Sequence, residues 1–131
     1  MKNLVEIFKS LSDSTRLRIL NLLIERECCV CEVVQALGIS QTRASRNLSQ
    51  LYDAGLLEQR REGLWVIYYP APQTLNDYRD LIIRAVGQGL ENNEQAAADR
   101  RRLRGSARLC PPGDTISPPT GSTPHPGSVR C

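Results

Sequence analysis

The chain has 131 residues, of which 40% are hydrophobic and 24% charged, with a formal net charge of +3 at pH 7. This length predicts one domain, whose core must be mostly aliphatic because the chain holds one Trp, one Phe and four Tyr. Residues 1–92 contain eleven basic and eleven acidic residues, so net charge alone gives no argument for nucleic-acid binding.

The first two helices are predicted from apolar residues at i, i+3 and i+4 spacing. Ser12 or Asp13 is placed to cap the second helix. The apolar positions of the first helix are Leu4, Ile7, Phe8 and Leu11, and those of the second are Leu17, Leu20, Leu23 and Ile24.

Two short helices joined by a tight turn follow. The first spans residues 30–37 and ends at Gly38, and the second begins after the capping residue Ser40 and ends at Gly55. This spacing is typical of a helix-turn-helix. The β-branched and aromatic run 64–69 follows a Glu62-Gly63 turn, which predicts a hairpin and so a winged helix.

A last amphipathic helix is predicted over residues 74–90, with Thr74 as its cap. The first and last helices both carry apolar stripes, and a small winged-helix core can cover only one of them well. We therefore expect a mainly α fold with a β-hairpin, a winged helix-turn-helix that dimerises through its first and last helices. Such a homodimer would read a pseudo-palindromic double-stranded DNA operator.

The composition changes near residue 92. Residues 93–131 carry six Arg against three acids, and six of the eight prolines lie after residue 110. We therefore expect a DNA-binding and dimerisation domain over residues 1–92 and a basic, disordered Pro/Gly/Ser-rich tail over residues 93–131. Residues 94–104 fit either a helical extension or a solvated linker, and the linker is favoured.

The start of the second helix of the helix-turn-helix is the candidate DNA-reading surface. Its side chains are short or fork-shaped hydrogen-bonding groups with no acid before Asp53, as base and phosphate contacts require. A merely solvated polar face is the alternative. Two arginines at the hairpin tip could grip phosphates, although Glu62 weakens that site. The candidate DNA-binding residues are Ser40, Gln41, Thr42, Arg43, Ser45, Arg46, Arg60 and Arg61.

Three of the five cysteines, Cys28, Cys29 and Cys31, fall within four positions. No stretch approaches the roughly 18 apolar residues of a membrane span and no export signal is recognisable, so we expect a cytoplasmic protein with no membrane partner. Cysteine thiols in the cytoplasm stay reduced and favour soft metals, and a position at the start of a helix favours the thiolate.

Residues at i and i+2 lie about 200° apart on a helix. Gathering all three sulfurs therefore requires the helix to begin after Cys29 or to unwind its first turn. Cys28 alternatively packs as a small buried hydrophobe.

Several motifs together resemble the ArsR/SmtB family of bacterial metal-sensing repressors over about residues 4–90. They are Leu-Ser-Asp-x-Thr-Arg at 11–16, Ser-Gln at 40–41, Ala-Gly-Leu at 54–56 and Arg-x-Gly-x-Trp at 61–65. The resemblance implies a dimeric repressor of operons that include its own gene. Arsenite-responsive members carry Cys-Val-Cys, here Cys29-Val30-Cys31, with a third thiol three residues later, where this chain has Val34. Cys28 is a candidate replacement. The family's zinc sensors use His on the last helix, and residues 74–91 contain none.

The resulting expectation is a repressor, not an enzyme, that leaves its operator when As(III) or Sb(III) binds as inducer to Cys28, Cys29 and Cys31; no cofactor is permanently bound. A thiol-redox sensor or a sensor of another soft metal such as cadmium remains an alternative on the same fold. A protein-interaction winged helix that binds no DNA is a further reading. The operator sequence, the third ligand and the roles of Cys110 and Cys131 stay open.

Overall fold

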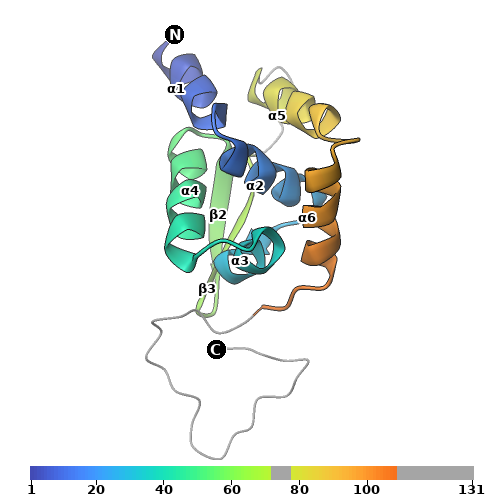
Figure 1. Ribbon diagram of the computed structural model, residues 1–131. Helices are drawn as coiled ribbons and strands as arrows, with labels where there is room; N and C mark the ends of the chain where they lie inside the picture. Colours follow the sequence, from blue (N-terminus) through green and yellow to red (C-terminus); the bar gives the residue numbers. More distant parts are fainter. Residues whose placement is uncertain (72–77, 109–131) are drawn as a thin grey trace, which may run out of the picture.

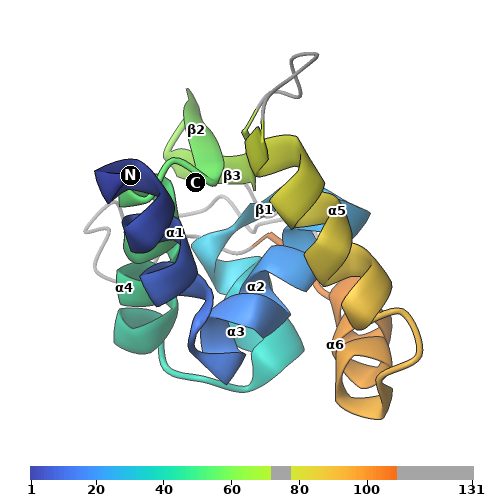
Figure 2. The same ribbon diagram turned by 90° about the horizontal axis from the view of Figure 1, so that it is seen from above.

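The computed structural model describes residues 1–71 and 78–108. Three antiparallel strands form a small sheet in the order β1-β3-β2, and the helices surround it (Figure 1). Helices α4 and α6 lie on opposite flanks (Figure 1). Helices α1 and α5 both lie at the upper end of the molecule in Figure 1, and Figure 2 shows them on opposite sides of that end. In chain order the elements are α1 (Lys2–Leu11), α2 (Ser14–Glu25), β1 (Cys28–Cys29), α3 (Val30–Leu37), α4 (Gln41–Asp53), β2 (Leu57–Glu62), β3 (Trp65–Pro70), α5 (Tyr78–Gly89) and α6 (Glu94–Arg104).

Local capping sets the helix-turn-helix as the sequence predicts. The Asp13 carboxylate accepts from the Arg16 backbone N–H at 3.0 Å and so begins α2. Gly38 ends α3 with a φ of 69°, a left-handed conformation that favours glycine. The Ser40 hydroxyl then accepts from the Arg43 backbone N–H at 3.1 Å and begins α4. The predicted turn between the two helices and the winged-helix fold are confirmed.

The sheet separates two apolar clusters. Cross-strand partners project to the same face, and neighbours along a strand project to opposite faces. Cys28 pairs with Tyr68 and packs in the main core, which is built around the fully buried side chains of α2. Cys29 pairs with Ile67 on the other face, in a smaller cluster with Cys31 and Trp65. The two-residue strand β1 was not predicted, and it determines that the side chains of Cys28 and Cys29 project to opposite faces of the sheet.

Helix α6 corrects the expectation of a solvated linker over residues 94–104. Ala96, Asp99 and Leu103 are completely buried. The Asp99 carboxylate accepts two hydrogen bonds from the Arg18 guanidinium of α2, at 2.8 and 2.9 Å. Arg102 donates to the Ala36 carbonyl of α3 at 2.6 Å. The folded part of the chain therefore extends beyond residue 92, because polar anchors replace the apolar stripe that α6 lacks. Residues 109–131 of the expected tail lie outside the described residues.

Helices α1 and α5 expose apolar side chains at the same end of the molecule (Figure 1). Phe8 is 54% exposed and Leu81 is 63% exposed, and Leu4, Val5 and Tyr78 of the same two helices are also exposed. Helix α5 begins at Tyr78, so the predicted cap Thr74 lies outside the described residues. Across residues 1–71 and 78–108, no helix is long and apolar enough to cross a bilayer.

Candidate functional site

Cys29 and Cys31 form a close thiol pair. Cys29 is the residue before α3, with extended backbone angles of −89° and 171°, and Cys31 lies in the first turn of that helix. Their sulfur atoms are 2.9 Å apart. Of the two arrangements expected from the i, i+2 spacing, the structure therefore has the helix beginning after Cys29. These two thiols meet without any unwinding of α3.

Cys28 is not part of this pair. Its side chain is completely buried in the main core, and its thiol lies 3.3 Å from the Arg26 carbonyl oxygen. Because neighbouring residues of β1 project to opposite faces of the sheet, Cys28 faces away from the sulfur atoms of Cys29 and Cys31. The structure thus brings together two of the three predicted ligands and separates the third. Within the described residues, no group of three or more His, Cys, Asp or Glu side chains could hold a metal ion.

The environment of Cys28 and Cys29 favours the protonated form of both thiols. The hydrogen bond with Cys31 and burial raise the pKa of the Cys29 thiol far above its ordinary value. Burial raises the pKa of Cys28 to about 12. The expectation that the helix start favours a thiolate is therefore wrong for Cys28 and Cys29, because burial and thiol–thiol contact outweigh the helix terminus.

Glu32 organises the start of α3 around the pair. Its carboxylate is 2% exposed, and it accepts from the Cys29 backbone N–H at 2.9 Å. It also forms ion pairs with Arg26 at 2.7 Å and with Arg108 at 3.1 Å. Glu32 was not among the predicted site residues, although an acid three residues after a helix cap is a known capping signal.

Arg108 closes the second cluster from the C-terminal side. After α6 the chain runs back beneath α3 towards the tip of the hairpin (Figure 1). The Ala107 backbone exchanges two hydrogen bonds with the Gln35 side chain, at 2.7 and 3.1 Å. The Arg108 guanidinium then lies 5.8 Å from the centre of the Trp65 ring. Neither contact has a signal in the sequence, because both depend on the docking of α6.

A cavity of about 110 Å³ lies beside the two thiols. Its wall joins three functional elements: the start of α3, the first residue of α4 and the wing. The lining residues are Cys29, Val30, Cys31, Gln41, Leu64, Trp65 and Val66. A ligand held by the thiols would therefore contact both elements that were predicted to bind DNA.

The sulfur pair fits a soft, thiophilic centre. Bonds of about 2.3 Å to sulfur place two sulfur ligands of one atom roughly 3.4–3.8 Å apart. The observed 2.9 Å separation must therefore open by less than about 1 Å, which side-chain rotation supplies. Thiolate sulfur selects soft ions over hard ones such as magnesium or calcium.

The predicted DNA-binding residues of α4 differ in their exposure to solvent and in their hydrogen bonds within the protein. Thr42 and Arg46 are exposed, and Ser45 is half-buried. Arg43 is exposed, but its guanidinium donates to the Thr15 hydroxyl at 2.9 Å. Gln41 is half-buried and lines the cavity, and Ser40 caps the helix. These positions place Thr42 and Arg46 foremost among the candidates for base contacts.

A residue of α2 that positions α4 was not predicted. This residue is Arg16, which donates to the Ser10 carbonyl at 2.5 Å, to Asn47 at 3.0 Å and to Gln50 at 2.6 Å. It thereby fixes the orientation of α4 relative to α2. The wing arginines also differ from each other. Arg61 is exposed, whereas Arg60 forms ion pairs with Glu27 and Glu62 and lies 5.6 Å from the Tyr69 ring centre.

Comparisons with known proteins agree with this architecture. Residues 13–59 match the model described as "Bacterial regulatory protein, arsR family". The arsenic resistance transcriptional regulator ArsR1 of Pseudomonas putida is 42% identical over 99 residues, which are 74% of this chain and 74% of that protein. The arsenical resistance operon repressor of Escherichia coli is 46% identical over 69 residues, 52% of this chain and 59% of that protein.

Among solved structures, a homodimeric winged helix-turn-helix DNA-binding domain from Mycobacterium bovis matches with a TM-score of 0.59 and 30% identity. The match covers 71% of this chain and 82% of that domain. The family match over residues 13–59 includes both helices of the helix-turn-helix and the three cysteines Cys28, Cys29 and Cys31. The chain belongs to the arsR family of bacterial regulatory proteins.

Proposed function

We propose that the protein is a homodimeric transcriptional repressor that leaves its DNA operator when trivalent arsenic or antimony binds Cys29 and Cys31. The observation that carries the proposal is the 2.9 Å approach of the two thiols in a cavity that is also lined by Gln41 and Trp65. The similarity to arsenic resistance regulators supports the choice of inducer.

DNA binding is assigned to the exposed start of α4 and to the wing. Thr42 and Arg46 carry the base contacts, because both are exposed at the start of α4, the part of a recognition helix that reaches the major groove. Arg61 is the wing residue that contacts phosphate. Arg60 serves instead to hold the wing against Glu27, next to the first cysteines.

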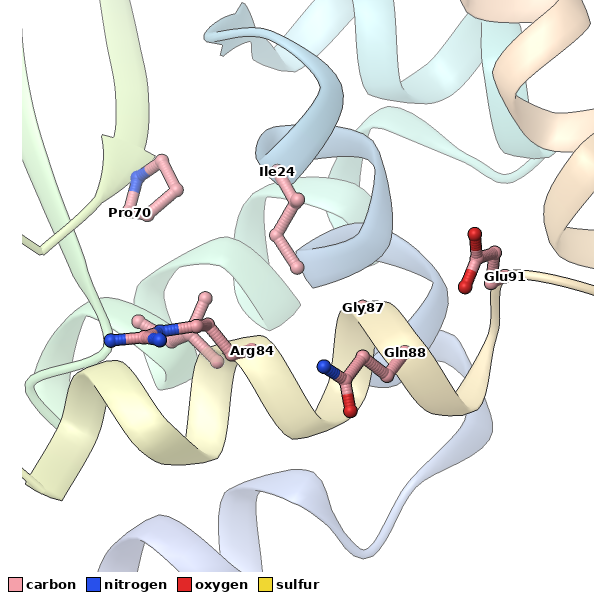
Figure 3. A pocket seen from close by; sticks show the side chains of 7 residues that line it. Ile24, Pro70, Arg84, Gly87, Gln88 and Glu91 are labelled. Atoms are coloured by element: carbon pink, nitrogen blue, oxygen red, sulfur yellow. The ribbon is translucent and has the colours of Figure 1, made fainter.

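Dimerisation is assigned to the end of the molecule formed by α1 and α5. Phe8 and Leu81 are more than half exposed there, and a second copy of the chain would cover both. A groove of about 370 Å³ lies between α2, β3 and α5 (Figure 3). Ile24, Pro70, Ile83 and Gly87 line it, with the polar side chains of α5 at its rim. The dimer places two α4 helices for successive half-sites of a pseudo-palindrome.

Coupling between inducer and DNA passes through the shared cavity wall. Separating the two sulfurs and placing an ion beside them displaces Gln41 and Trp65, which belong to the two DNA-contacting elements. Of the two alternatives from the sequence, unwinding of the first turn of α3 is not needed for this pair, since α3 begins after Cys29 and the two sulfurs already lie together. A coupling of about 1–3 kcal/mol between the sites is sufficient for regulation.

The test is a titration of fluorescently labelled DNA from the region upstream of the protein's own gene. We expect specific binding that Thr42→Ala and Arg46→Ala weaken by about 1–3 kcal/mol each, whereas the exposed α6 control Arg101→Ala leaves it unchanged. Arsenite and antimonite should then release the DNA. Failure to bind this DNA at moderate salt would refute repression and favour a protein-interaction role.

A thiol-redox repressor is the second candidate, and the short sulfur–sulfur distance favours it. Two observations count against it: the two thiols are buried, and the pKa of Cys29 is raised. The cysteine thiols of oxidation sensors are instead exposed and have a low pKa. Peroxide added to the DNA complex separates the two candidates. Release by arsenite but not by peroxide supports the metalloid inducer, release by peroxide alone supports the redox sensor, and release by cadmium alone points to another soft metal.

A further inference from the structure

The segment formed by residues 103–108, which we call the strap, is anchored to the helix-turn-helix at successive points. The Arg26 guanidinium, at the end of α2, donates to the Leu103 carbonyl at 2.9 Å. Further along, the Ala107 backbone exchanges two hydrogen bonds with the Gln35 side chain of α3, at 2.7 and 3.1 Å. The last residue of the strap is therefore held at a fixed place beside α3.

That last residue, Arg108, joins α3 to the tip of the wing. Its guanidinium forms an ion pair with Glu32 of α3 at 3.1 Å. On the other side it lies 3.9 Å from the Glu62 carboxylate and 5.8 Å from the centre of the Trp65 ring. Glu62 and Trp65 face each other across the hairpin and close its turn at Gly63. One side chain thus ties the end of the wing to the helix-turn-helix.

We infer that Arg108 is a positioning residue for the DNA-binding wing. The inference rests on the proposed function, in which Arg61, the chain neighbour of Glu62, contacts phosphate. Arg108 holds the hairpin tip and so presents Arg61 to the DNA, but it makes no DNA contact of its own. Arginine suits this role because its planar guanidinium stacks on an indole ring while its N–H groups pair with carboxylates.

The fold should survive the removal of this side chain. Glu32 is 2% exposed, but it keeps its ion pair with Arg26 at 2.7 Å, so Arg108→Ala leaves no buried charge without a partner. Strand β3 keeps its pairing with both β1 and β2. The expected consequence is a wing that is less fixed relative to α4 in a protein that stays folded.

The first test measures DNA affinity as a function of salt concentration, with the full chain and labelled DNA from upstream of its own gene. Arg108→Ala should weaken binding by between about twofold and thirtyfold, the range set by one cation–π contact. The slope of log K against log salt concentration should stay at the wild-type value. Arg61→Ala should instead lower that slope by about one, because it removes a phosphate contact.

Two further variants separate position from charge. Arg108→Lys keeps the charge but not the planar group, so it should also weaken DNA binding. Gln35→Ala changes no charge and removes an anchor of the strap, so it should weaken binding in the same direction. The matched control is Arg101→Ala, an exposed arginine of α6, which should leave affinity and slope unchanged.

Trp65 gives a second readout without DNA. It is the chain's one tryptophan, and the Arg108 guanidinium lies over its ring. Quenching of its fluorescence by acrylamide, a neutral quencher, should therefore be stronger in Arg108→Ala than in the wild type and unchanged in Arg101→Ala. Equal quenching in all three proteins would overturn the contact between the strap and the wing.

The outcomes distinguish this inference from the proposed function. If the wild type binds the DNA and Arg108→Ala binds equally well, the inference is wrong and the repressor assignment stands. A salt slope lowered by about one in Arg108→Ala would make Arg108 a phosphate ligand and overturn its positioning role. Full affinity in Arg108→Lys would likewise reduce its role to charge. If the wild type binds no DNA, the proposed function fails, and the inference fails with it.

Discussion

Replacing Cys28 with alanine separates the structural cysteine from the ligand cysteines. Its side chain is completely buried, and the substitution removes one sulfur atom. The lost transfer free energy is about 0.8–1 kcal/mol. A residual cavity of about 25 Å³ adds roughly 0.6 kcal/mol at about 24 cal/mol per Å³. The unfolding free energy should therefore fall by about 1.5 kcal/mol, which leaves a typical domain folded.

The inducer response should survive this change. In Cys28→Ala, the arsenite concentration that releases half of the labelled DNA should stay within about twofold of the wild-type value. In Cys29→Ala or Cys31→Ala, loss of the chelating pair should raise it by roughly 10²–10⁴-fold. Urea denaturation measures the first effect and fluorescence anisotropy the second. A Cys28→Ala protein of normal stability that no longer responds to arsenite would refute the separation of Cys28 from the site.

Three further predictions concern the parts of the fold that support the site. Asp99→Ala leaves Arg18 without its buried partner and should lower the unfolding free energy by about 3 kcal/mol, measured by thermal denaturation. The exposed pair of Arg104 with Glu25 provides the control, and Arg104→Ala should lower the unfolding free energy by less than about 1 kcal/mol. Equal losses of stability in both variants would contradict the assignment of Asp99 as the buried residue that anchors α6. Leu81→Asp should raise the dimer dissociation constant at least about 100-fold in sedimentation velocity, because two copies each lose an apolar contact; an unchanged constant would remove α5 from the interface. Burial raises the pKa of Cys28 from 9.0 to about 12, so the folded state keeps a proton that the unfolded state loses. The contribution of Cys28 to stability should thus be complete below pH 9.0 and decrease by about 1.4 kcal/mol per pH unit above it, so that stability falls more steeply than in Cys28→Ala; identical slopes would contradict this.

The sequence was sufficient for the winged helix because its signals are local. Gly38 and Ser40 fix the turn before α4 through their own backbone and side chain, and both are recognisable without tertiary information. The direction of Cys28 was not predictable in the same way, because it depends on the two-residue pairing of β1 with β3. The predicted helix over residues 30–37 left the conformation of Cys28 and Cys29 open, whereas in the structure these two residues form a strand and so project to opposite faces.

Helix α6 was missed for a different reason. It lacks an apolar stripe and docks through Asp99 and Arg102, whose partners Arg18 and Ala36 are distant in the sequence. The same docking brings Arg108 to Glu32 and Trp65, so a neighbour of the thiol site comes from a segment that composition assigned to a tail. Arg60 likewise reads as a phosphate ligand in the sequence, and only the structure pairs it with Glu27.

The most direct test of the account titrates arsenite into the DNA complex of a variant in which Cys29 and Cys31 are both serine. Serine keeps the size of the side chains and removes the soft ligands. The account predicts that this variant binds the DNA as the wild type does and stays bound at every arsenite concentration that releases the wild type. Release of the double variant at the wild-type concentration would contradict the assignment of the inducer site to this thiol pair.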